Sequence, residues 1–563
     1  MFDKLANIAQ GQTVRSRYTL AFIAYWSIVF LLYLPAARAG RVGDFPGWVT
    51  FLNSVSFTDY INRKGSGIPS LYQFTQVVTW FFYKLFGVSA WLWHLLYITM
   101  QAINALLLYS FFKKLFIYSE VKFAAIIAFS GALLFCVTPY ISEVVVWEPS
   151  FHYLLALMMM LGILVCTQNF LYLGKSRYAW LAGLLFFLSS YSLEIFYLTP
   201  LFTLSYALHF YFGLKGEKER FKSVLKYIVL PQATLFLLHF LVLKARYHEG
   251  IAHIGSMSLQ FSVANCSKGL KYVFHIVGLG RFLPMALRKA VYEFCETGPG
   301  LAAFYATVAA TIIYIAIRYK KMKPSRRVTV LVFAWCLASL ALILPLSFPD
   351  LGLVILDRYT YLLDAFIYML ILLLAGQLAG KRMLITFVAI YCLVLARYTH
   401  RANAYWRQSA EIVDNLINTF PNDTTKKVLL LSLPECLDGV QMVGTRDDGE
   451  FRMMYNALKP VKITNAVHDV EAFYMSSPAD GAHVTVLDDK TARVTLNQWG
   501  TWWLYYGMGA TSYQNADYKV NMKDPGHLYE ITLKHPAGEY LLLFSTGRKW
   551  RVVDWQKKNI DQY

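Results

Sequence analysis

Charged side chains are scarce in this chain of 563 residues. Asp, Glu, Lys and Arg together make up 15% of the sequence, against about 25% in an average soluble domain. Hydrophobic residues make up 57% and aromatic residues 17%. A soluble monomer of this composition would expose more contiguous apolar surface than such proteins tolerate. The composition therefore excludes an ordinary soluble protein and predicts an integral membrane protein.

Negative charge is the scarcer kind, with 34 Asp and Glu against 53 Lys and Arg. Residues 425–563 hold 16 of each kind, so the whole net charge of +19 comes from the apolar part before them. There the basic residues form short clusters between hydrophobic runs, which is typical of cytoplasmic loops in membrane proteins. We therefore interpret the charge as a sign of membrane topology and expect no nucleic-acid partner.

Motifs for cofactors and metals are missing as well. The sequence has no Gly-rich phosphate loop between a strand and a helix, which argues against a cytoplasmic nucleotide site. It has no His and Cys residues at zinc-site spacing. We expect no cofactor and predict no metal site, although the chemistry inferred below would be compatible with a divalent metal.

Eleven apolar runs are long enough to cross a membrane, which takes about 20 residues. With the N-terminus in the cytoplasm, every basic connection between these runs falls on the cytoplasmic side. No cleavable signal is evident, so the first run is expected to act as the targeting signal too. The odd number of spans places the C-terminal part outside, in the periplasm of a bacterial inner-membrane protein. The runs lie near residues 18–37, 90–112, 123–140, 152–172, 178–194, 195–213, 224–244, 299–318, 327–347, 359–379 and 382–398.

The segment Leu71 to Phe86 is apolar enough to be counted as a twelfth span. Counting it would move Lys113 and Lys114 outside and invert every later loop. We therefore predict a re-entrant or interfacial helix with Trp80 and Lys84 at headgroup depth.

The C-terminal part changes from helical to alternating periodicity. Four segments beginning at His483, Ala492, Tyr529 and Tyr540 alternate like short strands, and Lys427 begins another candidate strand. The prediction is a transmembrane domain over residues 1–400, a polar linker helix over 401–424, and an extracytoplasmic β-rich domain over 425–563.

Polar residues of functional interest collect in the loops predicted to face outward. Carboxylates at a membrane surface are costly unless solvated or paired, so they are candidates for function, although each alone also fits a solvated loop or a helix cap. Near cations, they suit a reaction on a lipid-linked phosphate, in which a carboxylate deprotonates a hydroxyl and an Arg or Lys neutralises the departing phosphate. The candidates are Asp44, Asp59, Glu143, His152, Glu194, Arg358 and Tyr361.

Two cysteines, Cys266 and Cys295, share one of these outward loops. Because that loop is predicted on the oxidising side and has few other anchors, we expect a disulfide between them.

Several short motifs resemble those of a known family. They are Leu85-Phe86-Gly87 followed by His94 and a long apolar helix, Asp357-Arg358-Tyr359-Thr360-Tyr361 before a late span, and Asn403-Ala-Tyr-Trp406 after the last span. Together they resemble membrane-embedded GT-C glycosyltransferases, in the branch of the protein O-mannosyltransferases and the tetratricopeptide-bearing O-mannosyltransferases. The resemblance covers about residues 18–420. It departs from that branch at Gln101, where a second histidine is expected, and in lacking a repeat array.

The resemblance implies roles for individual residues. Its catalytic base is an Asp shortly after the first span, a position that Asp44 matches. Asp59 is a weaker candidate, because it also fits a helix start capped by Thr58. Glu194 matches an acid that positions donor or acceptor, and Arg358 would hold the donor phosphate or, alternatively, anchor the chain at lipid headgroups. The remaining substrate-binding candidates are Glu143, His152 and Tyr361.

The predicted function is an inverting transferase that moves a sugar from a polyprenyl-phosphate donor to an acceptor hydroxyl at the outer face. The acceptor is a glycan, a lipid or a protein, and membrane lipid surrounds the enzyme. A lipid-linked oligosaccharide polymerase or ligase would have nearly the same architecture. A lipid-glycan transporter would explain the spans, but such proteins usually place polar groups near the bilayer midplane.

Overall fold

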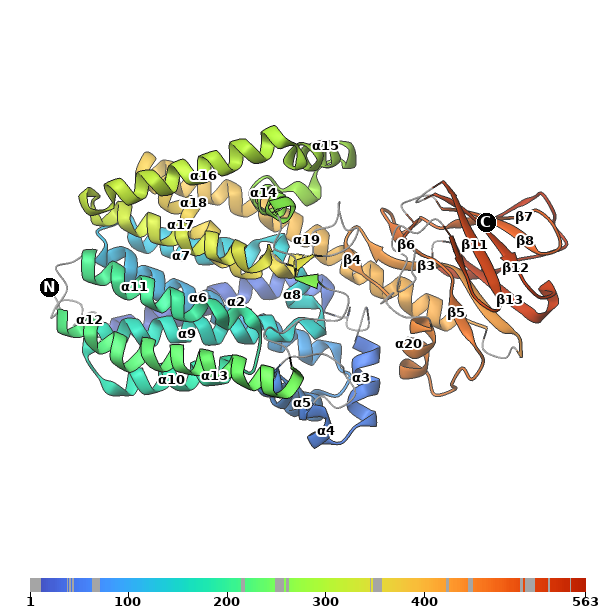
Figure 1. Ribbon diagram of the computed structural model, residues 1–563, viewed down its shortest axis with the longest axis horizontal. Coiled ribbons are helices and arrows are strands. Elements are labelled where there is room, and N and C mark those ends of the chain that lie inside the picture. The colour runs from blue at the N-terminus through green and yellow to red at the C-terminus, as the bar shows by residue number, and fades with distance from the viewer. Residues whose placement is uncertain are drawn as a thin grey trace.

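The chain forms a bundle of long helices and a β-domain that lie end to end (Figure 1). The helices α11 and α12 reach the end of the bundle away from the β-domain, and the C-terminus lies in the β-domain. The computed structural model describes residues 12–37, 39, 42, 45–62, 71–213, 218–248, 258–259, 263–344, 346–347, 357–421, 425–443, 449–496, 500–501, 512–524, 527–546 and 548–563.

Nine helical segments in the described part of the chain are long and apolar enough to cross a membrane. These helices confirm a polytopic α-helical membrane protein. They are α2 with η1 (Gln12–Tyr33, Leu34–Ala36), α6 (Ala90–Tyr118), α9 (Phe151–Leu173), η4 with α11 (Glu194–Leu198, Thr199–Gly213), α12, η5 and α13 (Lys218–Val224, Leu225–Val229, Leu230–Tyr247), α16 (Gly298–Arg318), α17 (Pro324–Ile343), η8 with α18 (Asp357–Thr360, Tyr361–Leu378) and α19 (Lys381–Thr419).

Two of the eleven predicted runs form shorter helices. α7 (Ala124–Val137) stops before Pro139 and continues at a bend of 54° into η2 and α8 (Pro139–Ile141, Ser142–Val146), and this bent pair would make a tenth span. α10 (Ser176–Ser189) has 14 residues, about 21 Å of helix, which is short of the bilayer core. It follows α9 after Gly174, whose φ of +67° ends that helix.

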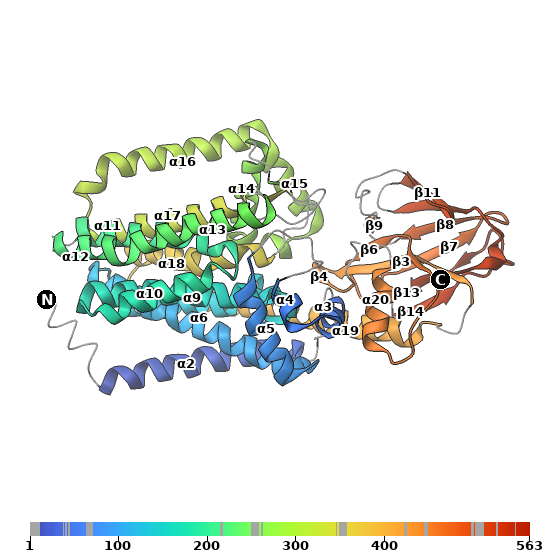
Figure 2. The ribbon, with the colours of Figure 1, turned by 60° about the horizontal axis from the view of Figure 1, so that its bottom comes forward.

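The basic connections meet at the far end of the bundle. Lys114 at the end of α6 donates to Asn169 near the end of α9 (2.9 Å), and Arg220 of α12 donates to the carbonyl of Leu171 (2.8 Å). α12 lies at the end of the bundle away from the β-domain in Figures 1 and 2. The basic clusters and the β-domain therefore lie at opposite ends, as the predicted threading requires.

Short helices cover the end of the bundle that faces the β-domain (Figure 2). One of them, α5 (Gln73–Phe86), lies in the segment that could have been counted as a twelfth span. It is not among the membrane-length helices, and its start docks on the turn before η4, where Phe74 N donates to the Tyr191 carbonyl (3.0 Å). This placement fits the predicted interfacial helix. The short helices at this end of the bundle are α3 (Phe45–Ser54), α4 (Phe57–Asn62), α5 (Gln73–Phe86), η3 (Glu148–Ser150), α14 (Val263–Val277), η6 (Gly280–Phe282) and α15 (Met285–Glu296). A small pair of strands, β1 with β2 (Ser258–Leu259, Leu346–Ser347), lies nearby.

The β-domain contains two sheets, so the predicted β-rich domain is confirmed. One is antiparallel, and its strand β8 shows the alternating burial from which it was predicted. In the order of the sheet its strands are β10 (Ser512–Gln514), β11 (Tyr518–Asp524), β12 (Leu528–Leu533), β8 (Thr491–Leu496), β7 (Ala482–Val486) and β15 (Asp561–Gln562).

The other sheet is mixed. Its strand β3 pairs in parallel with β5, β6 and β13 and is buried on both faces, which explains its continuous apolar sequence. Its elements are β14 (Lys549–Val552), β13 (Tyr540–Thr546), β3 (Lys427–Leu437), β6 (Ala472–Met475) and β9 (Gly500–Thr501), with β4 (Val440–Gln441), β5 (Val467–Asp469) and the crossover helix α20 (Glu450–Leu458).

A single helix of 39 residues, α19, joins the bundle to the β-domain. The linker helix predicted from residue 401 is the C-terminal half of α19, because no Pro or Gly interrupts it. Asn403 anchors it midway: its amide donates to the Leu32 carbonyl (2.8 Å), and its oxygen accepts from Ser142 (2.8 Å).

Candidate functional site

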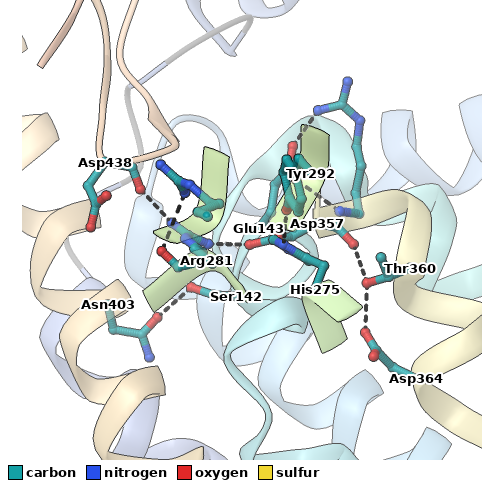
Figure 3. Close-up of polar contacts among 12 residues, drawn as sticks. Ser142, Glu143, His275, Arg281, Tyr292, Asp357, Thr360, Asp364, Asn403 and Asp438 are labelled. Carbon is teal, nitrogen blue, oxygen red and sulfur yellow. Dashed lines mark hydrogen bonds and ion pairs between the residues drawn. The ribbon is translucent and has the colours of Figure 1, made fainter. Parts of the chain in front are cut away.

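A buried cluster of charged residues lies at the domain-facing end of the bundle (Figure 3). At its centre, Asp357 begins the short helix η8. One carboxylate oxygen lies 2.8 Å from His275 Nε2, and the other pairs with Arg281. Tyr292 OH contacts the remaining His275 nitrogen at 3.4 Å. Because Asp357 is only 4% exposed, these partners compensate most of the cost of burying its charge.

Next to Asp357 in sequence, Arg358 makes a separate buried ion pair. Its guanidinium pairs with Glu143 of α8, and its backbone N–H donates to the second Glu143 oxygen (2.9 Å). The guanidinium also lies over the rings of Trp147 (4.9 Å) and Tyr359 (5.0 Å). The contact with Glu143 involves one guanidinium nitrogen, so the group keeps further donors with which it can bind an anion.

Local geometry explains how these residues meet. The break before Pro139 turns the chain, so that α8 approaches η8 and brings Glu143 to Arg358. Thr360 then ties η8 to α18: its hydroxyl bonds the Asp357 carbonyl (2.8 Å) and the carboxylate of Asp364 (2.8 Å). Asp364 is fully buried one turn into α18.

The helices α14 and α15 add cations to this cluster. Lys271 and Arg288 are each 7% exposed; Lys271 Nζ lies 5.6 Å from the Tyr292 ring centroid, and Arg288 contacts the Arg281 carbonyl at 3.4 Å. Burial lowers the pKa of Arg281, but the charge of Asp357 outweighs it and the pKa is raised, so Arg281 remains charged. Four cations therefore lie among the carboxylates Glu143, Asp357, Asp364 and Asp438, and their guanidinium and ammonium donors suit an anionic ligand. The four cations are Lys271, Arg281, Arg288 and Arg358.

A second group of predicted residues lies at the start of η4. Both carboxylate oxygens of Glu194 are 2.8 Å from the hydroxyl of Tyr72. The rings of Tyr72 and His152 are stacked, with their centroids 6.1 Å apart. The ring centroids of the next residue, Tyr153, and of Tyr359 are 6.4 Å apart. The structure therefore brings Glu194 and His152 together through Tyr72, and a chain of aromatic rings leads from them to the cluster.

Tyr361 lies deeper in the bundle. It is fully buried, donates to the side-chain oxygen of Gln101 (2.6 Å), and accepts from Asn104 (3.0 Å). Gln101, where the resemblance led us to expect histidine, is thus a partner of the Tyr-containing motif. Because Gln101 and Asn104 both belong to α6, Tyr361 holds α6 and α18 together.

Asp59 lies in the first turn of α4. Its backbone N–H donates to Ser56 Oγ (3.1 Å), and its carboxylate accepts from the same hydroxyl (2.7 Å). Ser56 thus caps the start of α4. The cap is Ser56 and not Thr58, whose hydroxyl was the expected cap.

Two other predictions depend on residues that the structure does not describe. Asp44, the expected base, lies outside the described residues, immediately before α3. The side chain of Cys266 also lies outside them, whereas Cys295 is buried in α15. Both the role of Asp44 and the disulfide stay predictions.

Sequence reasoning missed the central position of Asp357 and its partner His275. The signal available was the pair Asp357-Arg358 at the start of an apolar run, where only Arg358 was selected. Asp364 was a second signal, as a carboxylate inside a predicted span. Among the described residues, no group of three or more His, Cys, Asp or Glu is arranged to hold a metal ion.

No protein-family model and no curated protein matches this sequence. Its structure is similar to that of the Archaeoglobus fulgidus oligosaccharyltransferase in complex with Zn and sulfate (12% identity, 79% of this chain and 62% of that one, TM-score 0.39). The same enzyme tethered with an acceptor peptide containing the NVT sequon is similar too (11%, 79% and 63%, TM-score 0.37). So is ArnT from Cupriavidus metallidurans in the apo state (14%, 81% and 90%, TM-score 0.33). The chain spans less than two thirds of the archaeal enzyme, and at these TM-scores none of the three assigns a role to any residue of this protein.

Proposed function

We propose that this protein is an inverting GT-C glycosyltransferase that uses a polyprenyl-phosphate-linked sugar at the outer face of the membrane. The observation that carries the proposal is the buried cluster around Asp357 and Arg358 at one end of a membrane bundle, where the Arg358 guanidinium pairs with Glu143 through one nitrogen and keeps further donors. Such a site favours a phosphate that gains negative charge as the sugar departs.

The residues have separate roles in the proposed reaction. Arg358 holds the donor phosphate through guanidinium donors beyond the one paired with Glu143. Arg281 and Lys271 raise the local positive potential, which stabilises the departing polyprenyl phosphate. Asp44, placed immediately before α3, removes the proton from the acceptor hydroxyl as general base. Glu194 and His152, joined by Tyr72, bind hydroxyl groups of the donor sugar or of the acceptor.

The test is the variant Asp44→Asn in the full-length protein, reconstituted in membranes with labelled polyprenyl-phosphate sugars. The amide keeps the size of the carboxylate but cannot accept the proton, so transfer should fall about 10²–10⁴-fold while donor binding persists. Asp59→Asn should have a mild effect, because that carboxylate accepts from the capping Ser56 hydroxyl at the start of α4.

Arg358→Ala should behave differently, because it removes a group that binds the phosphate in both the ground state and the transition state. Donor affinity and turnover should both fall. Full turnover in Asp44→Asn would remove Asp44 from the mechanism, and a large loss in Asp59→Asn would place the base there instead. Products with one added sugar would distinguish a transferase from a polymerase or ligase, which would add an oligosaccharide.

A further inference from the structure

One guanidinium connects the membrane site to the β-domain. Arg281, in η6, pairs with Asp357 through one terminal nitrogen. Its other terminal nitrogen donates to the backbone carbonyl of Asp438, at 2.9 Å. Asp438 belongs to the turn between β3 and β4, so Arg281 contacts both parts of the molecule at once. Figure 3 shows this bridge.

The β3–β4 turn has a conformation that allows this close approach. Asp438 and Gly439 both have left-handed backbone angles, with φ of 47° and 84°. A Cβ at position 439 would lie 3.4 Å from the Arg281 guanidinium nitrogen and 3.6 Å from the hydroxyl of Tyr474. These are ordinary contact distances, so glycine is required for the positive φ, and any other residue would strain the turn that contacts Arg281.

The side chain of Asp438 completes the junction. Its carboxylate lies 3.8 Å from Arg401 of α19. Burial raises the pKa of Asp438, and the nearby Arg281 and Arg401 oppose that rise. The turn is thus held between the loop that carries Arg281 and the helix that enters the β-domain.

We propose that Arg281 is a positioning residue and that the β3–β4 turn acts on the membrane site by holding Arg281 against Asp357. The planar fork of arginine can satisfy two partners at fixed angles, which lysine cannot do. If the turn moves away, Arg281 loses one partner and is freer to rotate away from Asp357. A displacement of the turn would therefore change the charge arrangement of the membrane site. The effect on turnover rests on the function proposed above, whereas the coupling between the two parts does not.

The first experiment measures that coupling without any assay of activity. Hydrogen exchange is compared in the full-length protein and in Gly439→Ala. The matched control is Gly449→Ala, since Gly449 has a similar φ of 87° in the same domain but its nearest neighbours are Val467 and Arg452. We expect faster exchange in peptides spanning residues 263–296 with Gly439→Ala alone. Unchanged exchange there, or equal changes in both variants, would overturn the proposal.

The second experiment tests whether the turn acts through Arg281. Gly439→Ala and Arg281→Lys should each lower turnover, by about 10- to 100-fold if the displacement approaches 1 Å, below the temperature at which either variant unfolds. The double variant should lose no more than the worse single variant, because both changes remove the same contact. If the two losses of turnover multiply in the double variant instead, the proposal is overturned. If hydrogen exchange shows the coupling but the protein transfers no sugar, the result supports the present proposal and refutes only the proposed function.

Discussion

At the scale of single residues, the site depends on neighbours in sequence that face different partners. Asp357 pairs with His275 and Arg281, whereas Arg358 pairs with Glu143. Glu143 and Arg358 were each predicted as substrate-binding residues, but their pairing across 215 positions could not be predicted from one sequence. The resemblance suggested that Arg358 matters, and only the fold shows what neutralises its charge.

The first prediction at this scale concerns Glu143→Ala. Removing this carboxylate leaves the Arg358 guanidinium buried without its counter-charge, which typically costs about 3–5 kcal/mol. A thermal unfolding experiment in detergent should show a clear fall in the melting temperature. The control is Glu219→Ala, which removes an exposed pair with Lys222, and exposed pairs contribute little to stability because water and salt screen them. Equal small shifts in both variants would show that the Glu143–Arg358 pair carries little stability.

At the scale of helices and strands, composition and periodicity predicted most of the long helices and five strands of the β-domain. Apolar runs became helices because the length and composition of a span are local properties, and α19 stayed continuous because nothing interrupts it. The alternation that predicted β7, β8, β12 and β13 is equally local. The parallel partners of β3 were not predicted, because parallel pairing depends on the crossover through α20 and not on the strand's own pattern.

The pH dependence of stability at Asp517 tests how the two sheets of the β-domain are joined. Its carboxylate lies 2.5 Å from Lys427 of β3, 3.5 Å from His468 of β5, and 3.3 Å from Tyr540 of β13. Burial raises the pKa of Asp517, but Lys427 and the other partners outweigh it and the pKa is lowered.

The sign of the pH effect follows from this shift. A lowered folded-state pKa stabilises the protein above the unfolded value, near pH 4, and the contribution is lost as the pH falls through the folded pKa. Because Lys427 is half-exposed, the contribution is about 1 kcal/mol or less. Calorimetry of the full-length protein should show wild type melting above Asp517→Asn at pH 7, with the difference shrinking below pH 4. A constant difference across this range would assign the effect to packing instead.

At the scale of the whole molecule, the basic connections and the β-domain lie at opposite ends of the bundle. Lys114 and Arg220 hold α6, α9 and α12 together at one end, whereas α8 and α15, which carry Glu143 and Tyr292 of the cluster, lie at the other (Figure 1). The orientation stays a prediction from the basic clusters, because such clusters tend to remain in the cytoplasm during insertion. The contact between Arg281 and Asp438 could not have been predicted, since it depends on how the two parts are placed.

The last prediction is the orientation of the chain in the membrane. Lys113 near the end of α6 and Arg177 at the start of α10 should face the cytoplasm, while Asp489, in the exposed turn between β7 and β8, should face outward. Single cysteines at these positions, in a variant without the native cysteines, can be labelled with a membrane-impermeant maleimide in right-side-out vesicles. Asp489→Cys should react at once, and Lys113→Cys and Arg177→Cys only after the vesicles are permeabilised. Labelling of all three from the same side would contradict the alternating course of the helices. The reverse pattern would keep that course but place the Asp357 cluster in the cytoplasm, where a sugar donor exposed at the outer face could not reach it.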